Sequence, residues 1–169
     1  YIIDSGVNED HSDFVGRILT NLDFYVDPPV GNPPDCCILP GIGDNNGHGT
    51  HVIGSIAGTK YGVAKKAKLH SLKIFNAAGF GSTSGLLSAL NWVKNNHIAP
   101  AVLNMSLGAS PSPALAESLS AVHNSGVIMV AAAGNQNTNA CNHYPSRLGF
   151  VISVGATNIL DNRSNFSNK

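Results

Sequence analysis

The chain has 169 residues, of which 43% are hydrophobic and 12% are charged, and its Lys and Arg residues balance its Asp and Glu residues at 10 each. This length suffices for one compact domain with a substantial core. The neutral balance gives no electrostatic footprint for nucleic acid or an anionic membrane, and no apolar run approaches the roughly 20 residues that a membrane-spanning helix needs. We therefore expect no nucleic-acid partner and no membrane partner.

The first predicted element is a buried strand, residues 1–3, which ends in the tight turn Asp4-Ser5-Gly6. Sites in open α/β sheets gather beyond the carboxyl ends of strands, so Asp4 stands where chemistry can occur. For an isolated Asp, a turn or a helix cap is the commoner explanation. Residues 10–47 are predicted to be loop-like, because prolines and glycines interrupt every regular pattern.

The stretch from Gly43 to Gly58 is rich in glycine and contains two histidines, His48 and His51. A helical pattern of small residues follows, which indicates a loop that delivers His48 to the start of a helix. Histidine changes its protonation state near neutral pH, which makes His48 a candidate general base. A surface loop with two incidental histidines is the alternative.

A strand is predicted over residues 69–75, followed by a glycine-rich turn and a helix with Leu86, Leu90 and Val93 on one face. Strand, glycine-rich turn and helix are also the outline of a dinucleotide-binding site. However, residues 79–85 have the spacing G-x-G-x-x-x-G rather than G-x-G-x-x-G, and the next strand ends without the Asp or Glu that would hold a ribose. These departures argue against a nucleotide cofactor.

The second half of the chain continues to alternate strands and helices. Strands are predicted over residues 101–105, 127–130 and 150–154. Between the first two of them lies a helix with Ser112 as its N-cap and Pro113 at its first position. This alternation predicts an α/β fold with a mainly parallel sheet and right-handed crossovers.

Several residues that can carry chemistry fall at one edge of the predicted sheet. Asp4 ends one strand, His48 opens a helix, Ser106 follows a third element and Asn135 follows a fourth. An Asp that faces a His is the orienter and the base of a nucleophilic triad, and an Asn amide in the same cleft can stabilise an oxyanion. These residues include no obvious activated nucleophile.

Seven short motifs together resemble the subtilisin superfamily of serine proteases, and most closely its proteinase K-like branch. They follow the order of the family, at near the family's spacing, across almost the whole chain. The motifs are residues 4–6, D-S-G; 48–51, H-G-T-H; 61–66, Y-G-V-A-K-K; 79–82, G-F-G-S; 104–108, N-M-S-L-G; 131–135, A-A-A-G-N; and 154–157, V-G-A-T, with 164–168, S-N-F-S-N. The resemblance implies an α/β three-layer sandwich with a mainly parallel central sheet, incomplete at both ends, in which residues 1–169 are part of a single peptidase S8-type catalytic domain.

By this resemblance, Asp4 orients the catalytic histidine, His48 is the general base and Asn135 is the oxyanion-hole donor. His51 belongs to the same motif but is not the base, and we expect it to help hold the helix. The resemblance also implies a polypeptide substrate that is bound as an extended strand. The residues expected to bind the substrate are Gly79, Phe80, Gly81, Ser106, Leu107 and Gly108, and those expected to line the S1 pocket are Ala132, Ala133 and Gly134.

One element of the family is missing, namely the Gly-Thr-Ser-Met-Ala segment that carries the nucleophilic serine. It would lie beyond Lys169, and Ser84, Ser106 and Ser153 do not match it. We therefore expect serine endopeptidase activity of the parent protein and no activity of residues 1–169 alone. The alternative is a catalytically inactive homologue that acts as a protein-binding module, and the intact Asp, His and Asn positions argue against it.

The resemblance further implies a secreted, extracellular protein, with its own propeptide as an additional partner, and a reaction that requires no cofactor. No Cys or His set has the spacing of a metal site such as zinc. Members of the family often bind structural calcium, and residues 149–151 resemble part of one such site, whose carboxylate would come from outside the chain. Cys141 is expected to pair with a cysteine beyond Lys169, and Cys36 and Cys37 are expected in a surface loop.

Overall fold

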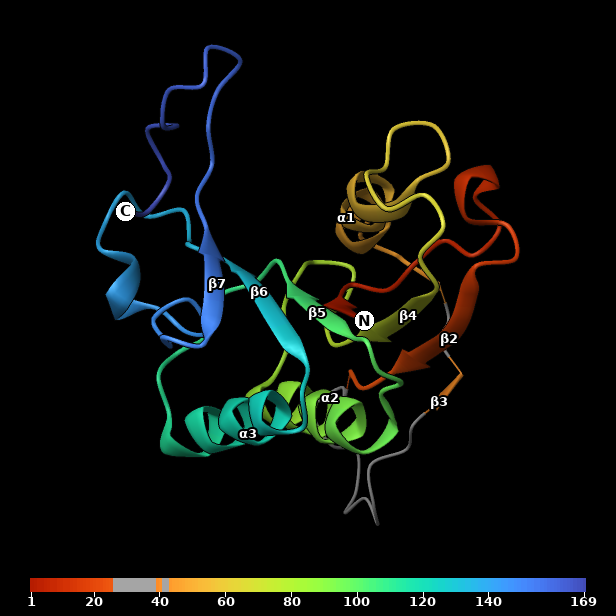
Figure 1. The fold of residues 1–169 in the computed structure, drawn as a ribbon, viewed down its shortest axis with the longest axis horizontal. Coiled ribbons are helices and arrows are strands. Elements are labelled where there is room, and N and C mark those ends of the chain that lie inside the picture. The colour runs from red at the N-terminus through yellow and green to blue at the C-terminus, as the bar shows by residue number, and fades with distance from the viewer. Residues whose placement is uncertain (26–38, 41–42) are drawn as a thin grey trace. The chain divides into compact units, whose positions relative to one another are not determined.

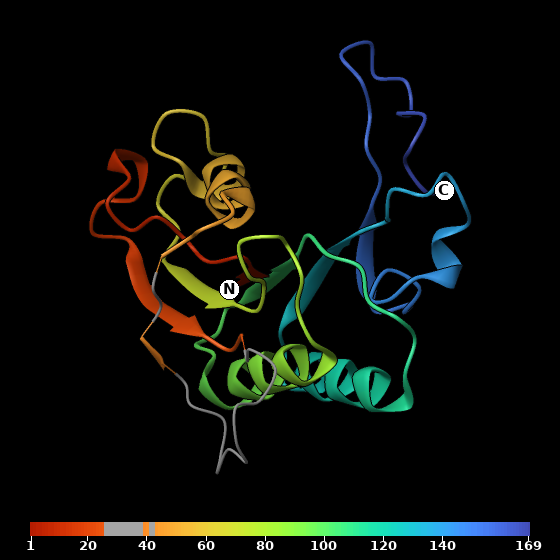
Figure 2. The same cartoon turned by 180° about the vertical axis from the view of Figure 1, so that it is seen from behind.

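The computed structural model describes residues 1–25, 39–40 and 43–169, and it divides into two compact units, Tyr1–Ala89 and Leu90–Lys169. The boundary lies inside helix α2, which spans Thr83–Asn96. Two opposite views show the strands and helices of both units (Figures 1 and 2). No helix within these described residues is long and apolar enough to cross a membrane.

The first unit is built on the strands β1 (Ile2–Asp4), β2 (Ile18–Asp23), β3 (Leu39–Pro40) and β4 (Leu69–Lys73). They lie in the order β3-β2-β4-β1. β1 and β2 both run parallel to β4, whereas β3 is antiparallel to β2. The carboxyl ends of β1 and β4 therefore lie side by side, which is the edge at which the sequence predicts a site.

Helix α1, His48–Ala57, packs on one face of these strands (Figure 1). The hydrophobic core between them is made of Ile2, Val7, Phe14, Ile53, Ala57 and Leu69, where Phe14 comes from the short 3-10 helix η1, Ser12–Phe14. Burial of a side chain of the size of Ile or Leu contributes about 1.5–3 kcal/mol to stability. Because His48 is the first residue of α1, this packing also fixes the position of the histidine relative to β1.

The second unit is built on the parallel strands β5 (Val102–Met105), β6 (Ile128–Ala132) and β7 (Val151–Val154), which are neighbours in that order. Helix α3, Pro113–Asn124, connects β5 to β6. The Ser112 hydroxyl caps it by accepting a hydrogen bond from Leu115 N at 3.1 Å. The predicted cap and the predicted N-terminal proline of this helix are confirmed.

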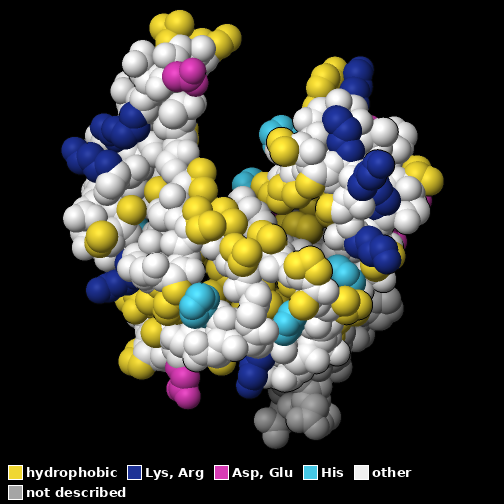
Figure 3. Space-filling model, in the orientation of Figure 1, with side chains coloured by type: hydrophobic (Ala, Val, Ile, Leu, Met, Phe, Trp, Pro, Cys, Tyr) yellow, Lys and Arg dark blue, Asp and Glu magenta, His cyan; other side chains and the backbone are white. Residues whose placement is uncertain are grey.

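After β7 the chain forms a long projecting loop, closed by the isolated bridge between Thr157 and Arg163. Its tip is hydrophobic, because Ile159 is 99% exposed and Leu160 is 74% exposed. Figure 3 shows hydrophobic side chains, in yellow, at the end of this loop. A short 3-10 helix, η2 (Ala140–Asn142), precedes β7.

The predicted α/β class and the mainly parallel pairing are confirmed in both units. The prediction that residues 10–47 form only a loop is wrong, because β2 lies within them. β2 has the sequence I-L-T-N-L-D and lacks the apolar run of a buried strand. It forms because it pairs with β4 at Ile18 and at residues 20–23, with a register shift between Ile18 and Thr20. The predicted surface loop with Cys36 and Cys37 lies outside the described residues.

Candidate functional site

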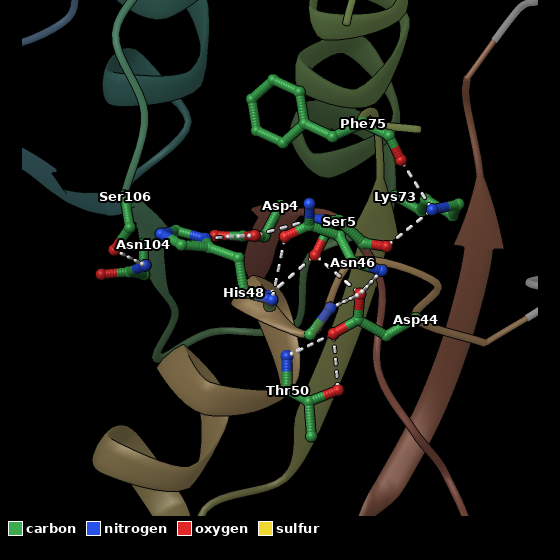
Figure 4. Close-up of polar contacts among 12 residues, drawn as sticks. Asp4, Ser5, Asp44, Asn46, His48, Thr50, Lys73, Phe75, Asn104 and Ser106 are labelled. Carbon is green, nitrogen blue, oxygen red and sulfur yellow. Dashed lines mark hydrogen bonds and ion pairs between the residues drawn. The ribbon is translucent and has the colours of Figure 1, made fainter. Parts of the chain in front are cut away.

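The carboxyl end of β1 and the first residue of α1 bring Asp4 and His48 together. The His48 Nδ1 atom lies 2.7 Å from Asp4 Oδ1, and Figure 4 shows the two side chains facing each other. Asp4 is 1% exposed, whereas 53% of the His48 side chain is exposed. The buried carboxylate thus holds one ring nitrogen of a largely exposed histidine side chain and makes no contact with the other.

The electrostatic environment of Asp4 is dominated by its burial, which raises the pKa of its carboxyl group above the ordinary value of 3.8. Hydrogen bonds from His48 and from Ser5 N, the latter at 2.7 Å, oppose this rise, and the nearby charge of Asp44 adds to it. Both hydrogen bonds reach Oδ1. Within the described residues, Oδ2 is buried and has no hydrogen-bond partner.

Asp44, which was not among the predicted site residues, organises the turn that precedes α1. Its Oδ1 accepts hydrogen bonds from Ser5 Oγ at 2.8 Å and Gly47 N at 2.8 Å, and its Oδ2 accepts from Thr50 N at 2.8 Å and Thr50 Oγ1 at 2.6 Å. Burial raises the pKa of Asp44, but these hydrogen bonds outweigh it and hold the pKa below 3.8. An Asp just before a helical pattern is a known helix-start signal, and this signal could have identified Asp44.

The turn itself requires glycine at two places. Gly47 is the residue before α1 and has a φ of 94°, in the left-handed region that glycine adopts without strain. Gly49 lies so close to β1 that an added Cβ would overlap the carbonyl oxygen of Gly6. The glycines around His48 therefore allow the start of α1 to reach the end of β1.

Ser5 and Lys73 complete the polar contacts next to Asp4. Ser5 Oγ accepts a hydrogen bond from Gly49 N at 2.9 Å. Lys73 is 2% exposed, and its Nζ donates to Ser5 O at 2.7 Å and to Phe75 O at 2.6 Å. Ser5, the residue after Asp4, is thus hydrogen-bonded to both α1 and β4.

The predicted substrate-binding segment of residues 79–81 lies in a turn of the same unit. The Asn76 side chain accepts hydrogen bonds from Phe80 N at 3.0 Å and Ala78 N at 3.0 Å. Asn46, which accepts a hydrogen bond from His48 N at 3.2 Å, also donates to Ala77 O at 3.0 Å. The turn is therefore connected to the start of α1, with the Phe80 side chain 73% exposed.

The remaining predicted site residues belong to the second unit. Asn135 is exposed in the loop after β6, and its side chain makes no hydrogen bond within the described residues. The loop is held by Asn168, which is 3% exposed and bonds to Ala133 O at 2.8 Å, Gln136 N at 3.0 Å and Thr138 N at 3.0 Å. Sequence reasoning assigned Asn168 to a motif without recognising this role.

Residues 106–108 follow β5 directly in the second unit. Ser106 Oγ accepts a hydrogen bond from Asn104 Nδ2 at 3.0 Å (Figure 4), and Leu107 is buried. After β6, Ala132 is half-buried, Ala133 is buried and Gly134 has a φ of 108°. These small residues keep the strand end free of bulky side chains.

A family model described as "Subtilase family", for peptidase S8, matches residues 1–169. The chain belongs to the subtilase family.

Individual relatives of this subtilase are named as proteases. The chain is 44% identical over 168 residues to an extracellular serine proteinase of Thermus sp. (strain Rt41A), covering 99% of this chain and 38% of that protein. It is 44% identical over 168 residues to alkaline serine exoprotease A of Vibrio alginolyticus, covering 99% of this chain and 29% of that protein. The subtilase chain thus spans less than two fifths of the length of either relative.

The fold of this subtilase is also found in solved structures. The crystal structure of a cold adapted subtilisin-like serine proteinase matches with a TM-score of 0.87 at 42% sequence identity, over 99% of this chain and 57% of that chain. The subtilisin-like fold class that the sequence motifs imply is confirmed.

Three further expectations concern residues outside the Asp4–His48 pair. His51 is exposed, and its side chain makes no hydrogen bond in the described part of this subtilase, so it does not hold the helix by that means. Residues 149–151 carry no carboxylate, and no group of three or more His, Cys, Asp or Glu residues among those described is arranged for a metal ion. Cys141 is exposed and forms no disulfide within the described residues, so its pairing with a distant cysteine stays a prediction.

Proposed function

We propose that residues 1–169 are the part of a secreted serine endopeptidase that carries the general base, its orienting carboxylate and an oxyanion-hole donor. His48 is the base, Asp4 orients it and Asn135 is the donor. The nucleophilic serine belongs to sequence outside residues 1–169. The observation that carries the proposal is the 2.7 Å contact between His48 Nδ1 and buried Asp4 Oδ1, formed by two motifs 44 residues apart in a subtilase.

In the proposed mechanism the exposed ring nitrogen of His48 removes the proton of the serine hydroxyl as the serine attacks a peptide carbonyl. The His48 Nδ1–H donates to Asp4, which selects the tautomer with a free Nε2 and stabilises the imidazolium that forms. His48 then gives the proton to the leaving amine. Burial of Asp4 strengthens this stabilisation, because water does not screen its charge.

The tetrahedral intermediate places a negative charge on the former carbonyl oxygen. The Asn135 amide supports an oxyanion role because it is exposed and its side chain makes no other hydrogen bond in the described residues. A donor of this kind contributes about 3–4 kcal/mol to the stabilisation of the transition state.

The proposed substrate is a polypeptide in extended conformation. Residues 79–81 and 106–108 offer backbone groups for pairing with it, and Ala132, Ala133 and Gly134 leave room for a substrate side chain. The named relatives support this substrate class, because they are called serine proteinases and an exoprotease, one of them extracellular. A propeptide that binds to the same segments before maturation is part of the proposal.

The test is hydrolysis of a peptide substrate by the whole protein and by its His48→Ala variant. We expect the variant to lose at least about a thousandfold in kcat, because the serine has no base. His97→Ala, at the position directly after α2, serves as the matched control and should retain the activity of the wild type. Turnover in His48→Ala equal to that of the wild type would overturn the role of His48, and an inactive wild type would indicate a non-catalytic, protein-binding homologue.

A further inference from the structure

We propose that Asp44 is a positioning residue, which holds the turn before α1, and with it His48, against the end of β1. The proposal rests on the proposed function, in which His48 is the base and Asp4 its orienter. Asp44 does not contact His48 or Asp4 through a hydrogen bond; it contacts the residues that adjoin them in the chain (Figure 4).

Asp44 is connected to Asp4 through hydrogen bonds of Ser5. Ser5 Oγ donates to Asp44 Oδ1 at 2.8 Å, and Ser5 N donates to Asp4 Oδ1 at 2.7 Å. Ser5 is 1% exposed and Asp44 is half-buried, so this bond is partly shielded from water. Asp44 thereby fixes the residue whose amide orients the carboxylate of Asp4.

Asp44 is connected to His48 through hydrogen bonds with the first turn of α1. Gly47 cannot cap the helix because it has no side chain, and Asp44 takes over this task by accepting from Gly47 N and Thr50 N. The Thr50 hydroxyl donates a third bond at 2.6 Å. His48 lies between these two anchor points, so the carboxylate of Asp44 determines how the first turn is oriented.

One carboxylate therefore joins the residue after β1 to the start of α1: its Oδ1 accepts from Ser5 Oγ and Gly47 N, and its Oδ2 accepts from Thr50. A helix cap alone would need only the bonds to Gly47 and Thr50. The additional bond to Ser5, across 39 residues of sequence, is what converts the cap into a connection between the two halves of the Asp4–His48 pair. Catalysis depends on such geometry to within a fraction of an ångström.

The charges that face this connection are those of Asp4 at the end of β1, His48 on α1 and Lys73 on β4. Lys73 Nζ donates to the backbone oxygen of Ser5 at 2.7 Å, whereas Asp44 bonds to the Ser5 hydroxyl. The charge of Asp44 contributes to the raised pKa of Asp4. Removal of that charge should consequently move the titration of Asp4 to lower pH.

The experiment compares wild type, Asp44→Asn, Ser5→Ala and the double variant in the whole protein, with Asp10→Asn as a control for loss of one carboxylate in the same unit. We expect Asp44→Asn and Ser5→Ala each to lower kcat about tenfold to a hundredfold, while KM changes less than about twofold. The double variant should lose less than the product of the two single effects, because both remove one connection. Asp10→Asn should leave kcat unchanged.

Two spectroscopic readouts separate positioning from stabilisation of the fold. The proton resonance of His48 Nδ1–H, which lies far downfield in a short bond to a carboxylate, should shift upfield or broaden in Asp44→Asn and in Ser5→Ala. The carbon resonance of the Asp4 carboxyl group should titrate at lower pH in Asp44→Asn. A variant that melts at lower temperature but keeps kcat and the His48 resonance would overturn the proposal, because Asp44 would then be only a helix cap.

Failure of the proposed function is distinguishable from failure of this inference. If His48→Ala retains full turnover, His48 is not the base. The His48 resonance requires no turnover, and its response to Asp44→Asn and Ser5→Ala still decides whether Asp44 positions the ring. An unchanged resonance in both variants would contradict the positioning role in either case.

Discussion

Asp4 combines burial with incomplete hydrogen bonding, and both properties suit a residue that holds a histidine. One of its oxygens receives bonds from His48 and Ser5, while the other is buried with no partner in the described residues. Burial makes the ionised carboxylate unfavourable for the stability of the folded protein. It also strengthens the electrostatic interaction between the carboxylate and His48. A sequence can show that an Asp ends a strand, but it cannot show which of its oxygens is satisfied.

The pH dependence of stability tests the raised pKa of Asp4. A carboxyl group whose pKa is raised on folding stabilises the protein below the unfolded value, and this contribution is lost as the pH rises through the folded value. Wild-type stability should therefore fall, relative to Asp4→Asn, as the pH rises from below 3.8 through the raised pKa of Asp4. Thermal unfolding of both proteins measures this difference, and a wild-type stability that rises relative to Asp4→Asn with rising pH would mean that the pKa of Asp4 is lowered instead.

The proposed role of Asn135 is in catalysis and not in the stability of the fold. Its side chain is exposed and contributes little to packing, so Asn135→Ala should leave the melting temperature nearly unchanged. We expect kcat of the whole protein to fall about a hundredfold to a thousandfold with little change in KM, because only the transition state carries the oxyanion. Steady-state kinetics checks this, and a raised KM at constant kcat would count against the role.

At the scale of elements, the decisive contact is the one between the start of α1 and the end of β1. The sequence predicts that a glycine-rich loop delivers His48 to a helix, and α1 does begin at His48. It does not predict Asp44 or Ser5 as partners, because their bond joins positions 39 residues apart. It also misses β2, whose pairing with β4 compensates for a weak apolar pattern. Local patterns predict elements well, whereas hydrogen bonds between distant segments require coordinates.

Two glycines of α1 provide a matched test of this close approach. Gly49→Ala places a Cβ against the Gly6 carbonyl oxygen and should destabilise the protein by about 1–3 kcal/mol. Gly54→Ala lies in the same helix with nothing within 4 Å of the new Cβ, and it should stabilise by about 0.5–1 kcal/mol. Chemical denaturation measures both, and equal effects of the two substitutions would contradict the close packing of Gly49 on β1.

At the scale of the whole molecule, the motifs were informative because they occur in series. Asp4, His48 and Asn135 would each suit a turn, a loop or a cap if they stood alone, and only their order within a subtilase gives them a common interpretation. The match of a family model to residues 1–169 and the TM-score of 0.87 confirm the family and the fold. The roles of the site residues remain predictions. The two named relatives are each more than twice as long as this chain.

The most direct test is the labelling of the whole protein by a serine-directed fluorophosphonate, with the modified residue located by mass spectrometry. We expect rapid labelling of a single serine outside residues 1–169, slowed at least about a thousandfold in His48→Ala. Labelling of a serine within residues 1–169, or an equal rate in His48→Ala, would contradict it.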